Sequence, residues 1–375
     1  MKKAVIISCY QWYDTRLKPI REQLTDRGFE TIILTTDYVH IKKKPVEVRY
    51  EDCIYIPVLH YRKNMSIARL RSHFQFAREV NAYIHKEQPE LIYLMIPPNN
   101  TGRYVMKYKR NHPETRLIVD IIDLWPESMP LKKLRHLPVM NVWRSWRDRC
   151  IALADYVFTE CGMYQDVLKY VIPQDKTTVL HLFKEQTSAL SEKVERIIDE
   201  GKKDDVVRFA YVGSMNSILD IEGICDILKR TVEEGVTVEF HAIGDGEKRE
   251  LFQEAARKTN AKVMFYGPVF DESKKVDILC RCDYAFNMMK DTSAVGLTIK
   301  SLDYFSMGLP IINNIKGDTW ELVERKGIGV NISKGFSASV HRQINHHEVR
   351  NVYTSMFTRE IFKQKIAKAL GDVLS

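Results

Sequence analysis

The sequence lacks the motifs of two large classes of nucleotide-binding enzyme. No Gly-x-Gly-x-x-Gly follows the first apolar run, which passes instead into Ser8–Asp14, and this disfavours a nicotinamide-dependent dehydrogenase. Gly244–Asp245–Gly246 is only a Gly-x-Gly and is a weak signal. No Gly-x-x-x-x-Gly-Lys-Ser/Thr segment occurs, which argues against a P-loop nucleotidase.

Disulfide and metal motifs are missing as well. The seven cysteines form no Cys-x-x-Cys pair, and an odd number without a framework is typical of a reducing compartment, so we expect a cytoplasmic protein. We expect Cys280 and Cys282 to pack in a core. No Asp-x-Asp pair offers itself, and four residues near the C-terminus do not match a zinc signature: His341, His346, His347 and Glu348. We therefore predict no metal site.

Long hydrophobic runs are absent too. No run of about 18 apolar residues occurs, so we predict no transmembrane span. The first ten residues mimic a signal peptide, but their apolar run is short and meets Gln11 and Asp14 at once. We interpret this run as a first buried strand.

Positive charge is concentrated in the first half of the chain. Residues 1–182 hold 29 Lys and Arg against 20 Asp and Glu, and the excess lies mainly in Arg62–Arg78 and Lys132–Arg149. Within Met129–Trp146, apolar and basic residues alternate, which suits docking on anionic lipid headgroups. A surface helix with its apolar side in the core explains the pattern equally well. No nucleic-acid-binding motif accompanies the charge, so we expect no nucleic-acid partner.

Alternating strand and helix patterns fill both halves of the 375-residue chain, a length that favours two domains. The pattern predicts an α/β protein with two doubly wound parallel sheets. The charged segment 184–205, nearly without aromatic residues, is expected to be the linker between domains at 1–183 and 206–345. The expected strands are Lys3–Ser8, Phe29–Thr35, Leu91–Met95, Leu117–Asp120, Asp155–Thr159, Val207–Val212, Thr237–Ile243, Lys262–Tyr266 and Tyr284–Met288. The expected helices are Leu17–Arg27, Arg103–Arg110, Ile221–Glu234, Lys248–Thr259 and Ser273–Cys280.

One stretch, Gly296–Ile312, combines a loop, a short helix and a buried strand. Thr298 is suited to cap the helix, Gly308 to end it in a left-handed turn, and Pro310 to prevent its continuation. Three apolar residues at helical spacing are expected to bury one side of this helix: Ile299, Leu302 and Phe305.

Lys300 and Asp303 lie on another side of the same helix. The unpaired N–H groups of the helix start, its partial positive charge and Lys300 together suit a diphosphate. One turn further on, Asp303 can accept hydrogen bonds from the two hydroxyls of a ribose. This pattern indicates a nucleotide, and the alternative is a solvated Lys300–Asp303 ion pair worth under about 0.5 kcal/mol.

Several segments in order resemble one family, the bacterial family-4-type glycosyltransferases of GT-B architecture. The segment Asp120–Ser128, with its Asp-Leu-Trp-Pro-Glu-Ser, is especially similar to enzymes that build surface polysaccharides on lipid carriers. The other segments are Asp14–Arg16, Pro97–Asn99, Ala154–Phe158, Tyr211–Ser214, Ile243–Gly246, Phe265–Val269 and Gly296–Ile312. The resemblance implies two Rossmann-like domains facing each other across a cleft, with a C-terminal helix at 356–375 packing back on the first domain.

The resemblance also implies roles for individual residues. The donor-binding set would be Gly213, Ser214, Gly267, Val269, Gly296, Leu297, Thr298, Lys300 and Asp303. The acceptor-binding set would be Tyr10, Gln11, Trp12, Arg16, Asn99, Trp125 and Glu127. Lys300 would stabilise the leaving diphosphate, and Asp123 is an acid–base candidate. For Gly213 and Gly267 the alternative is that they only satisfy turn geometry, and Asp120 is more readily explained as a structural hydrogen-bonding group.

The chain departs from the family pattern at several positions. Val295 stands where the family usually has the first carboxylate of a Glu pair, and Ile122 stands where a histidine is frequent. The basic pair that usually follows the strand ending at Gly213 is missing. Lys300 and the helix start would therefore carry most of the leaving-group stabilisation.

The expected activity is transfer of a sugar from a nucleotide diphosphate, with UDP expected, to a hydroxyl of a glycan or lipid-linked acceptor. The family implies retention of configuration, no catalytic metal and no cofactor besides the nucleotide sugar as co-substrate. We expect a cytoplasmic protein that contacts the inner face of the cell membrane peripherally. Two alternatives stay open: a non-catalytic partner subunit of another transferase and a nucleotide-sugar epimerase.

Overall fold

The computed structural model describes residues 2–11, 13–129, 137–290, 295–332 and 344–375. The chain forms two compact units, one of Met1–Leu182 with Arg359–Ser375 and one of Phe183–Thr358. Both are built on parallel sheets covered by helices, so the predicted α/β class with two doubly wound domains is confirmed.

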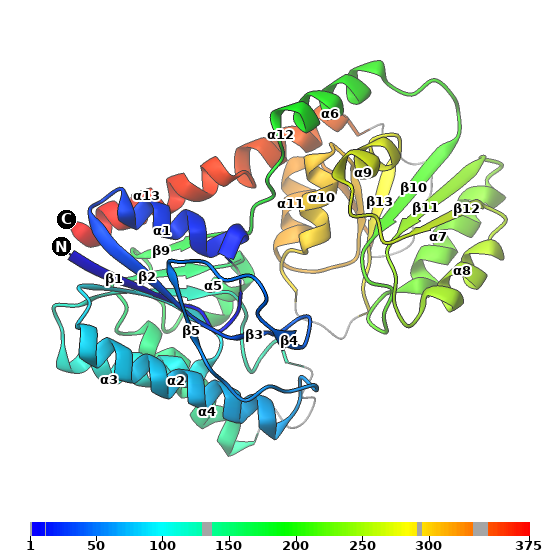
Figure 1. The fold of residues 1–375 in the computed structure, drawn as a ribbon. Coiled ribbons are helices and arrows are strands. Elements are labelled where there is room, and N and C mark those ends of the chain that lie inside the picture. The colour runs from blue at the N-terminus through cyan, green and yellow to red at the C-terminus, as the bar shows by residue number, and fades with distance from the viewer. Residues whose placement is uncertain (1, 12, 130–136, 291–294, 333–343) are drawn as a thin grey trace. The chain divides into compact units, whose positions relative to one another are not determined.

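The first unit is organised around a seven-stranded sheet in the order β5-β2-β1-β6-β7-β8-β9, and every neighbouring pair is parallel. Figure 1 shows α1 and α13 on one face of this sheet and α2, α3 and α4 on the other. The strands are β1 (Lys2–Ile7), β2 (Phe29–Thr36), β5 (Cys53–Ile56), β6 (Leu91–Ile96), β7 (Arg116–Ile121), β8 (Tyr156–Thr159) and β9 (Thr177–Val179). A short antiparallel pair joins β3 (Tyr38–Val39) to β4 (Lys44–Pro45).

The helices of this unit are α1 (Lys18–Thr25), preceded by the π-helical turn η1 (Tyr13–Leu17), then α2 (Ile67–Glu87), α3 (Asn99–Asn111), α4 (Pro138–Ile151), α5 (Gly162–Leu168) and α13 (Arg359–Leu374). All six residues of β6 are buried, as expected for a central strand of a parallel sheet covered on both faces. The helix expected at 356–375 is α13, which contacts α1: Arg27 donates to the Ala367 carbonyl at 3.1 Å, and Arg359 pairs with Glu22 at 2.7 Å.

The second unit has a six-stranded parallel sheet in the order β12-β11-β10-β13-β14-β15. Its strands are β10 (Val207–Val212), β11 (Val238–Ile243), β12 (Lys262–Gly267), β13 (Tyr284–Asn287), β14 (Ile311–Asn313) and β15 (Gly329–Asn331). Its helices are α6 (Ser188–Glu200), α7 (Ile221–Glu233), α8 (Arg249–Arg257), α9 (Glu272–Leu279), α10 (Ile299–Ser306), α11 (Asp318–Lys326) and α12 (His346–Met356). Aromatic side chains of β10, β11 and β13 pack with α7 and α8 in the core.

The strand order reverses once in each sheet. In the first sheet the chain leaves β1 for β2 on one side and later returns to β6 on the other. In the second sheet it leaves β10 for β11 and later returns to β13. Ligands of open parallel sheets bind outside the carboxyl ends of the strands at such a reversal. The loops that follow β1, β6, β10 and β13 are therefore the places to look for a site.

Two expectations about local structure differ from what is found. The segment expected as a linker, 184–205, contains α6 and belongs to the second unit, because Val194 is buried and Glu195 pairs with Arg350 of α12. Ile299 is 59% exposed rather than buried, because the first turn of α10 lies at the open edge of the sheet; Leu302 and Phe305 are buried as expected.

The cysteines and the hydrophobic segments agree with the sequence analysis. All seven cysteines are free thiols, and both Cys280 and Cys282 are buried. Within the described ranges, no helix combines the length and apolarity needed to cross a membrane. Of Met129–Trp146, residues 130–136 lie outside the described ranges, and α4 begins at Pro138.

Candidate active site

The start of α10 follows β13 at the reversal point of the second sheet. Thr298 caps the helix as predicted, because its hydroxyl accepts from the Ser301 backbone N–H at 3.3 Å. The same hydroxyl donates to the Asn287 side-chain oxygen at 2.9 Å, and Asn287 in turn donates to Asn313 at 2.9 Å. Gly308 ends the helix region with a φ of 65°, also as predicted. This amide ladder holds the helix start against the ends of β13 and β14.

Lys300 lies on the first turn of α10 and is half-buried. Its ammonium lies 5.2 Å from the centre of the Tyr211 ring, and burial lowers the pKa of Lys300 to about 8. Among the described residues, Lys300 has no carboxylate within ion-pair distance, and Asp303 pairs elsewhere. The alternative of a solvated Lys300–Asp303 ion pair is therefore wrong. Lys300 is thus a partly desolvated cation with which no carboxylate of the described residues pairs.

Two backbone donors accompany Lys300. The N–H groups of Ile299 and Lys300, at the first two helical positions, have no hydrogen-bond partner among the described residues. Tyr304 fixes the orientation of the helix, since its hydroxyl accepts from the Val212 N–H at 2.8 Å. The helix start, with its partial positive charge, and Lys300 are thus held over the end of β10, and this edge has the charge and the donors that suit an anion.

Glycines let three strand ends approach closely beside this edge. Gly213 has a φ of 143°, and a Cβ added to it would lie 3.9 Å from the Lys300 Cδ. A Cβ on Gly244 would lie 2.0 Å from the Gly213 carbonyl oxygen, and the Gly244 N–H donates to the Gly267 carbonyl at 2.9 Å. Gly213 is therefore brought next to Lys300, whereas the contacts of Gly267 satisfy the turn geometry of this edge.

The carboxylate of Asp303 is ion-paired with Lys184. Lys184 also reaches Glu272 at 2.7 Å. Burial disfavours the charged form of Lys184, but Asp303 and Glu272 outweigh it and raise the pKa of this lysine. A ribose at Asp303 would have to share this carboxylate with Lys184.

The remaining donor candidates lie on the same edge with fewer contacts. Ser214 is exposed, and its carbonyl accepts from the Tyr211 hydroxyl at 2.8 Å. The Gly296 carbonyl accepts from the Thr319 N–H and hydroxyl at 2.9 and 2.7 Å, which fixes the loop before α10. Leu297 is half-buried, and Val269 is half-buried two residues beyond the end of β12.

Asp123 follows β7 in the first unit and is half-buried. Its carboxylate accepts from the Leu124 N–H at 2.8 Å, from the Trp125 indole at 2.7 Å and from the Ser128 hydroxyl. The carboxylate therefore organises its own loop, and only its remaining lone-pair positions are open to a substrate.

Three predicted acceptor residues are committed to internal contacts. Arg16 is 1% exposed and forms a bidentate pair with Asp120 at 2.7 and 2.6 Å, which confirms the structural interpretation of Asp120. Glu127 pairs with Arg144 and Arg147, both at 2.7 Å. Asn99 is fully buried and donates to the carbonyls of Trp125 and Trp143. Arg16 and Asn99 have no surface to offer an acceptor, and the oxygens of Glu127 are already paired.

The other acceptor candidates converge at the reversal point of the first sheet. Tyr10 follows β1, and its ring lies 6.5 Å from that of Trp125. Two residues of α2 that the sequence analysis did not select contact Tyr10: Arg69 donates to its hydroxyl at 3.0 Å, and His73 lies 3.3 Å from it. Gln11 donates to the Thr36 carbonyl at 2.7 Å. Trp12 lies outside the described ranges.

Glu160 was also missed by the sequence analysis. It follows β8, and its N–H donates to the Ile121 carbonyl at 2.9 Å, which sets it at the edge that carries Asp123. Burial is the main cause that raises the pKa of Glu160 to about 7. Arg16 opposes this rise, and Asp120 and Asp123 add to it. A carboxyl that titrates near neutrality at a strand end is a candidate acid or base. Its only signal in the sequence was an acidic residue directly after a short strand.

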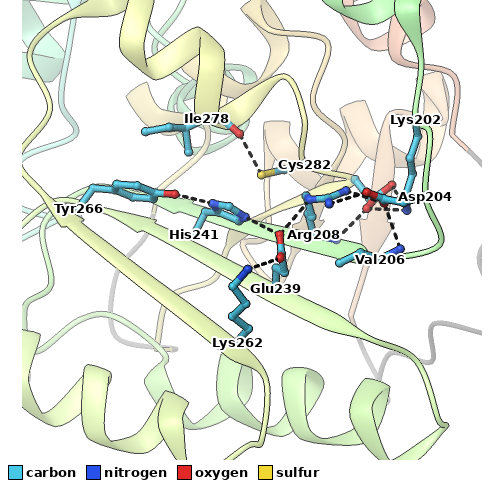
Figure 2. A network of polar contacts seen from close by, with 11 residues as sticks. Lys202, Asp204, Val206, Arg208, Glu239, His241, Lys262, Tyr266, Ile278 and Cys282 are labelled. Atoms are coloured by element: carbon cyan, nitrogen blue, oxygen red, sulfur yellow. Dashed lines mark hydrogen bonds and ion pairs between the residues drawn. The ribbon is translucent and has the colours of Figure 1, made fainter.

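A second polar cluster in the second unit has a different character. Figure 2 shows a row of side chains across β10, β11 and β12, in which Tyr266 contacts His241 at 2.9 Å and Glu239 pairs with Arg208 at 3.0 Å. Arg208 also pairs with Asp204 at 2.8 Å. This row lines a cavity of about 1200 Å³. Its acids and its arginine are mutually paired, so we assign it a structural role.

No metal cluster accompanies these edges in the described part of the chain, where no three His, Cys, Asp or Glu residues lie close enough to hold an ion.

Comparison with known proteins gives a family match to part of the chain and a fold for the whole of it. Residues 206–345 match the family described as glycosyl transferases group 1, which spans the second unit from β10 to the start of α12. No curated protein sequence matched the chain.

Solved structures match along the whole chain. A sucrose-phosphate synthase from Thermosynechococcus elongatus is similar with a TM-score of 0.68 at 12% identity, covering 100% of this chain and 99% of that one. HepE of Anabaena, in complex with UDP and glucose, is similar with a TM-score of 0.62 at 13% identity, and the match covers 99% of this chain and 100% of that one. The lipopolysaccharide outer core galactosyltransferase WaaB is similar with a TM-score of 0.64 at 15% identity, and the match covers 99% of each chain. The chain thus has the GT-B fold, and the family match over its second unit supports a glycosyltransferase.

Proposed function

We propose that this protein transfers a sugar from a nucleotide diphosphate to a hydroxyl of a glycan or lipid-linked acceptor. The observation that carries the proposal is Lys300, a half-buried cation that pairs with no acid among the described residues. Beside it lie two backbone N–H groups at a helix start that have no partner in the same part of the chain. This edge suits a diphosphate. The complex of HepE with UDP and glucose, in a protein of the same fold, supports UDP as the nucleotide.

The chemistry that this edge would serve is departure of the diphosphate. In the oxocarbenium-like transition state, negative charge grows on the leaving oxygen while positive charge grows on the sugar. Donors that are already oriented at that oxygen stabilise the transition state at no cost in reorganisation. Lys300 and the N–H groups of Ile299 and Lys300 would supply this stabilisation without a metal. Retention of configuration rests on the family resemblance, with the leaving phosphate as the proton acceptor.

Two carboxyl groups of the first unit are candidates for acid–base assistance. Asp123 accepts three hydrogen bonds within its own loop. Glu160 has a pKa raised to about 7, so it is the better matched to proton transfer near neutral pH. Comparison of Asp123→Asn with Glu160→Gln in kcat separates the two.

We place the enzyme peripherally at an anionic membrane surface. The support is a surface of exposed apolar residues on α2 and α4: Met65, Ile67, Leu70, Phe74, Leu137, Val139 and Val142. The rings of Phe74 and Trp146 lie 6.2 Å apart, which joins the two helices. Exposed Arg62, Lys63 and Arg71 lie on the same segment as the α2 residues. Apolar and basic groups together are typical of interfacial binding and fit an acceptor of surface-polysaccharide type.

The alternative of a non-catalytic partner subunit is favoured by two observations. Val295 stands where the family has a carboxylate, and Asp303 is paired with Lys184. Nucleotide release distinguishes the two functions. We expect thermal stabilisation by UDP rather than by GDP, ADP or CMP, and release of UDP from a UDP-sugar that requires an acceptor. Binding without turnover over a broad acceptor panel would favour the partner subunit, and a change in the donor sugar without acceptor would indicate an epimerase.

A further inference from the structure

Arg69 of α2 has a buried guanidinium whose N–H donors are only partly hydrogen-bonded within the protein. It is 8% exposed. Its Nη1 donates to the Asn64 carbonyl at 3.1 Å and its Nη2 to the Tyr10 hydroxyl at 3.0 Å, while its Nε has no partner. A guanidinium has five N–H donors, and the Tyr61 hydroxyl also accepts a side-chain hydrogen bond from Arg69, so not all of them are used. All three acceptors are neutral.

No acid compensates this charge. None of the described Asp and Glu side chains pairs with Arg69. The remaining residues of the first unit include no Asp or Glu; they are Met1, Trp12 and residues 130–136. Its other contacts are the faces of two rings, with the guanidinium carbon 4.6 Å from the centre of Trp125 and 5.8 Å from that of Tyr61. Such contacts contribute about 1–2 kcal/mol, less than the several kcal/mol that burying an unpaired ion costs. The charge is stabilised incompletely.

Further positive and ionisable groups surround Arg69. Lys43 hydrogen-bonds the side chain of Asn64, whose carbonyl accepts from Arg69, so two cations share one residue. The rings of His40 and His73 lie near the Tyr10 ring, at 5.0 and 6.2 Å between ring centres. Burial first, and then Arg69, lower the pKa of His40 to about 4 and that of His73 to about 3. The cluster is electropositive, and its own imidazoles stay neutral.

The cluster lies at the edge where a ligand of this unit is expected. Tyr10 follows β1, and Trp125 follows β7 beside β6, so both belong to the carboxyl ends of the strands next to the reversal point. The half-buried Tyr10, His40 and Lys43 form its accessible rim. Unpartnered buried polar atoms occur at the same edge, on Asn99 and Asn100 at the start of α3.

We propose that Arg69, with Lys43 and Tyr10, binds a phosphate group of the acceptor. This inference rests on the proposed function and specifies its acceptor as a phosphorylated sugar or a lipid-linked sugar phosphate. Two fixed cations without an acid suit a dianion better than a single carboxylate. The guanidinium donors that the protein leaves unpaired, Nε among them, supply the oriented hydrogen bonds that a phosphate accepts, and two neutral imidazoles lie beside them.

The first experiment tests the site without an acceptor. Inorganic phosphate is titrated into the full-length protein carrying Lys300→Ala, which removes the ammonium at the start of α10 in the second unit. The ring signals of His40 and His73 are followed by NMR. We expect saturable shifts of both signals that are lost in Lys300→Ala/Arg69→Met. Unchanged signals, or equal shifts with and without Arg69, would overturn the inference.

The second experiment tests the acceptor. Turnover of UDP-sugar is measured with pairs of acceptors that differ only in a phosphate, in one arm as soluble sugars and in the other as lipid-linked sugars. We expect kcat/KM at least tenfold higher for the phosphorylated member in one arm. Arg69→Met should remove this preference mainly through KM, Arg69→Lys should restore part of it, and the exposed Arg71→Met is the matched control.

Failure of this inference and failure of the proposed function give different results. Retained UDP binding in Arg69→Met shows that the protein is folded and the donor site intact. Equal turnover of neutral and phosphorylated acceptors, or a preference for a carboxylate-bearing acceptor, contradicts the phosphate site while the transferase stands. Absence of UDP binding in the wild type contradicts the transferase, and the phosphate titration still decides the Arg69 site.

Discussion

Lys300 is a partly buried cation of the second unit, and no acid in the described part of the chain pairs with it. Water is removed from its ammonium, and the Tyr211 ring replaces only part of that solvation. A diphosphate would complete the solvation of the ammonium and raise its pKa again. Loss of water around the ammonium therefore destabilises charged Lys300 in the free protein, and the same loss would strengthen its interaction with a bound diphosphate.

The lowered pKa of Lys300 predicts a pH dependence of UDP binding. The pKa of Lys300 in the free protein is lowered to about 8, so the charged form that binds phosphate is lost as pH rises above 8. Affinity should be nearly constant between pH 6.5 and 7.5 and fall by up to tenfold per pH unit above 8, measured by calorimetry. Lys300→Arg should remove the fall below pH 10, since a guanidinium stays charged. Identical profiles for both proteins would exclude Lys300 from the site.

Glu160 gives a second pH prediction at the residue scale. Its folded pKa is raised to about 7 from an ordinary value of 4.5, so the folded state binds more protons than the unfolded state between these values. Its contribution to the free energy of unfolding is therefore fully present below pH 4.5 and lost as pH rises through 7, a change of about 3 kcal/mol. Chemical denaturation at pH 5 and pH 8 should show a smaller difference in Glu160→Gln than in the wild type. An unchanged difference would mean that Glu160 titrates normally.

At the scale of elements, α10 acts through the way it is anchored. Thr298 caps the helix and reaches Asn287 of β13, and Tyr304 binds the backbone of β10. These contacts tie the helix start to both strands at the reversal point. The position of the N–H groups therefore depends on a hydroxyl that need not touch the ligand.

Removal of this hydroxyl tests the anchoring. Thr298→Ala should lower the free energy of unfolding by about 1 kcal/mol and weaken UDP binding several-fold, because the cap and the link to Asn287 are both lost. Thr298→Ser keeps the hydroxyl and should behave almost as the wild type. The two variants are compared by chemical denaturation and calorimetry. Equal UDP affinity in all three proteins would show that the anchoring does not serve the site.

The elements that the sequence predicted are those with local signals. The cap at Thr298, the left-handed Gly308 and the alternating strands and helices depend on residues within a few positions of each other, and they were found as expected. Helix α6 was taken for a linker because it is highly charged. Its one fully buried residue, Val194, and its pairing with Arg350 of α12 depend on a segment about 155 residues away.

The site residues were predicted unevenly for the same reason. Lys300 could be chosen from its position on a capped helix. Arg16 and Glu127 are also polar residues near strand ends, but distant partners consume their charges. Arg69 gave no local signal beyond the basic run Arg62–Arg78, because its environment is built by Tyr10 and Trp125, 59 and 56 residues away. Sequence spacing shows which charges exist but not which remain unpaired.

At the scale of the whole molecule, the two units divide the proposed task. The second unit presents an anion-binding edge for a nucleotide, and the first presents aromatic and basic groups at its own reversal point. The excess of positive charge in residues 1–182 belongs to the first unit. Part of that charge lies beside exposed apolar residues of α2 and α4, which is the basis for a membrane prediction.

Vesicle binding tests the membrane surface. The protein should sediment with vesicles containing anionic phosphatidylglycerol and not with pure phosphatidylcholine, and raised salt should weaken the binding because the basic residues contribute through charge. Ile67→Asp with Val142→Asp should reduce binding at least tenfold and leave UDP affinity unchanged, since these residues are 72% and 53% exposed in the first unit. Leu251→Asp, at a 52% exposed position of α8 in the second unit, is the matched control. Equal vesicle binding by all three proteins would show that this surface does not bind the membrane.

A crystal structure of the complex with UDP would show where the diphosphate lies. We predict that the diphosphate lies against the start of α10, within hydrogen-bond distance of the backbone N–H groups of Ile299 and Lys300 and of the Lys300 ammonium. A diphosphate bound elsewhere, with this edge still unoccupied, would contradict the account.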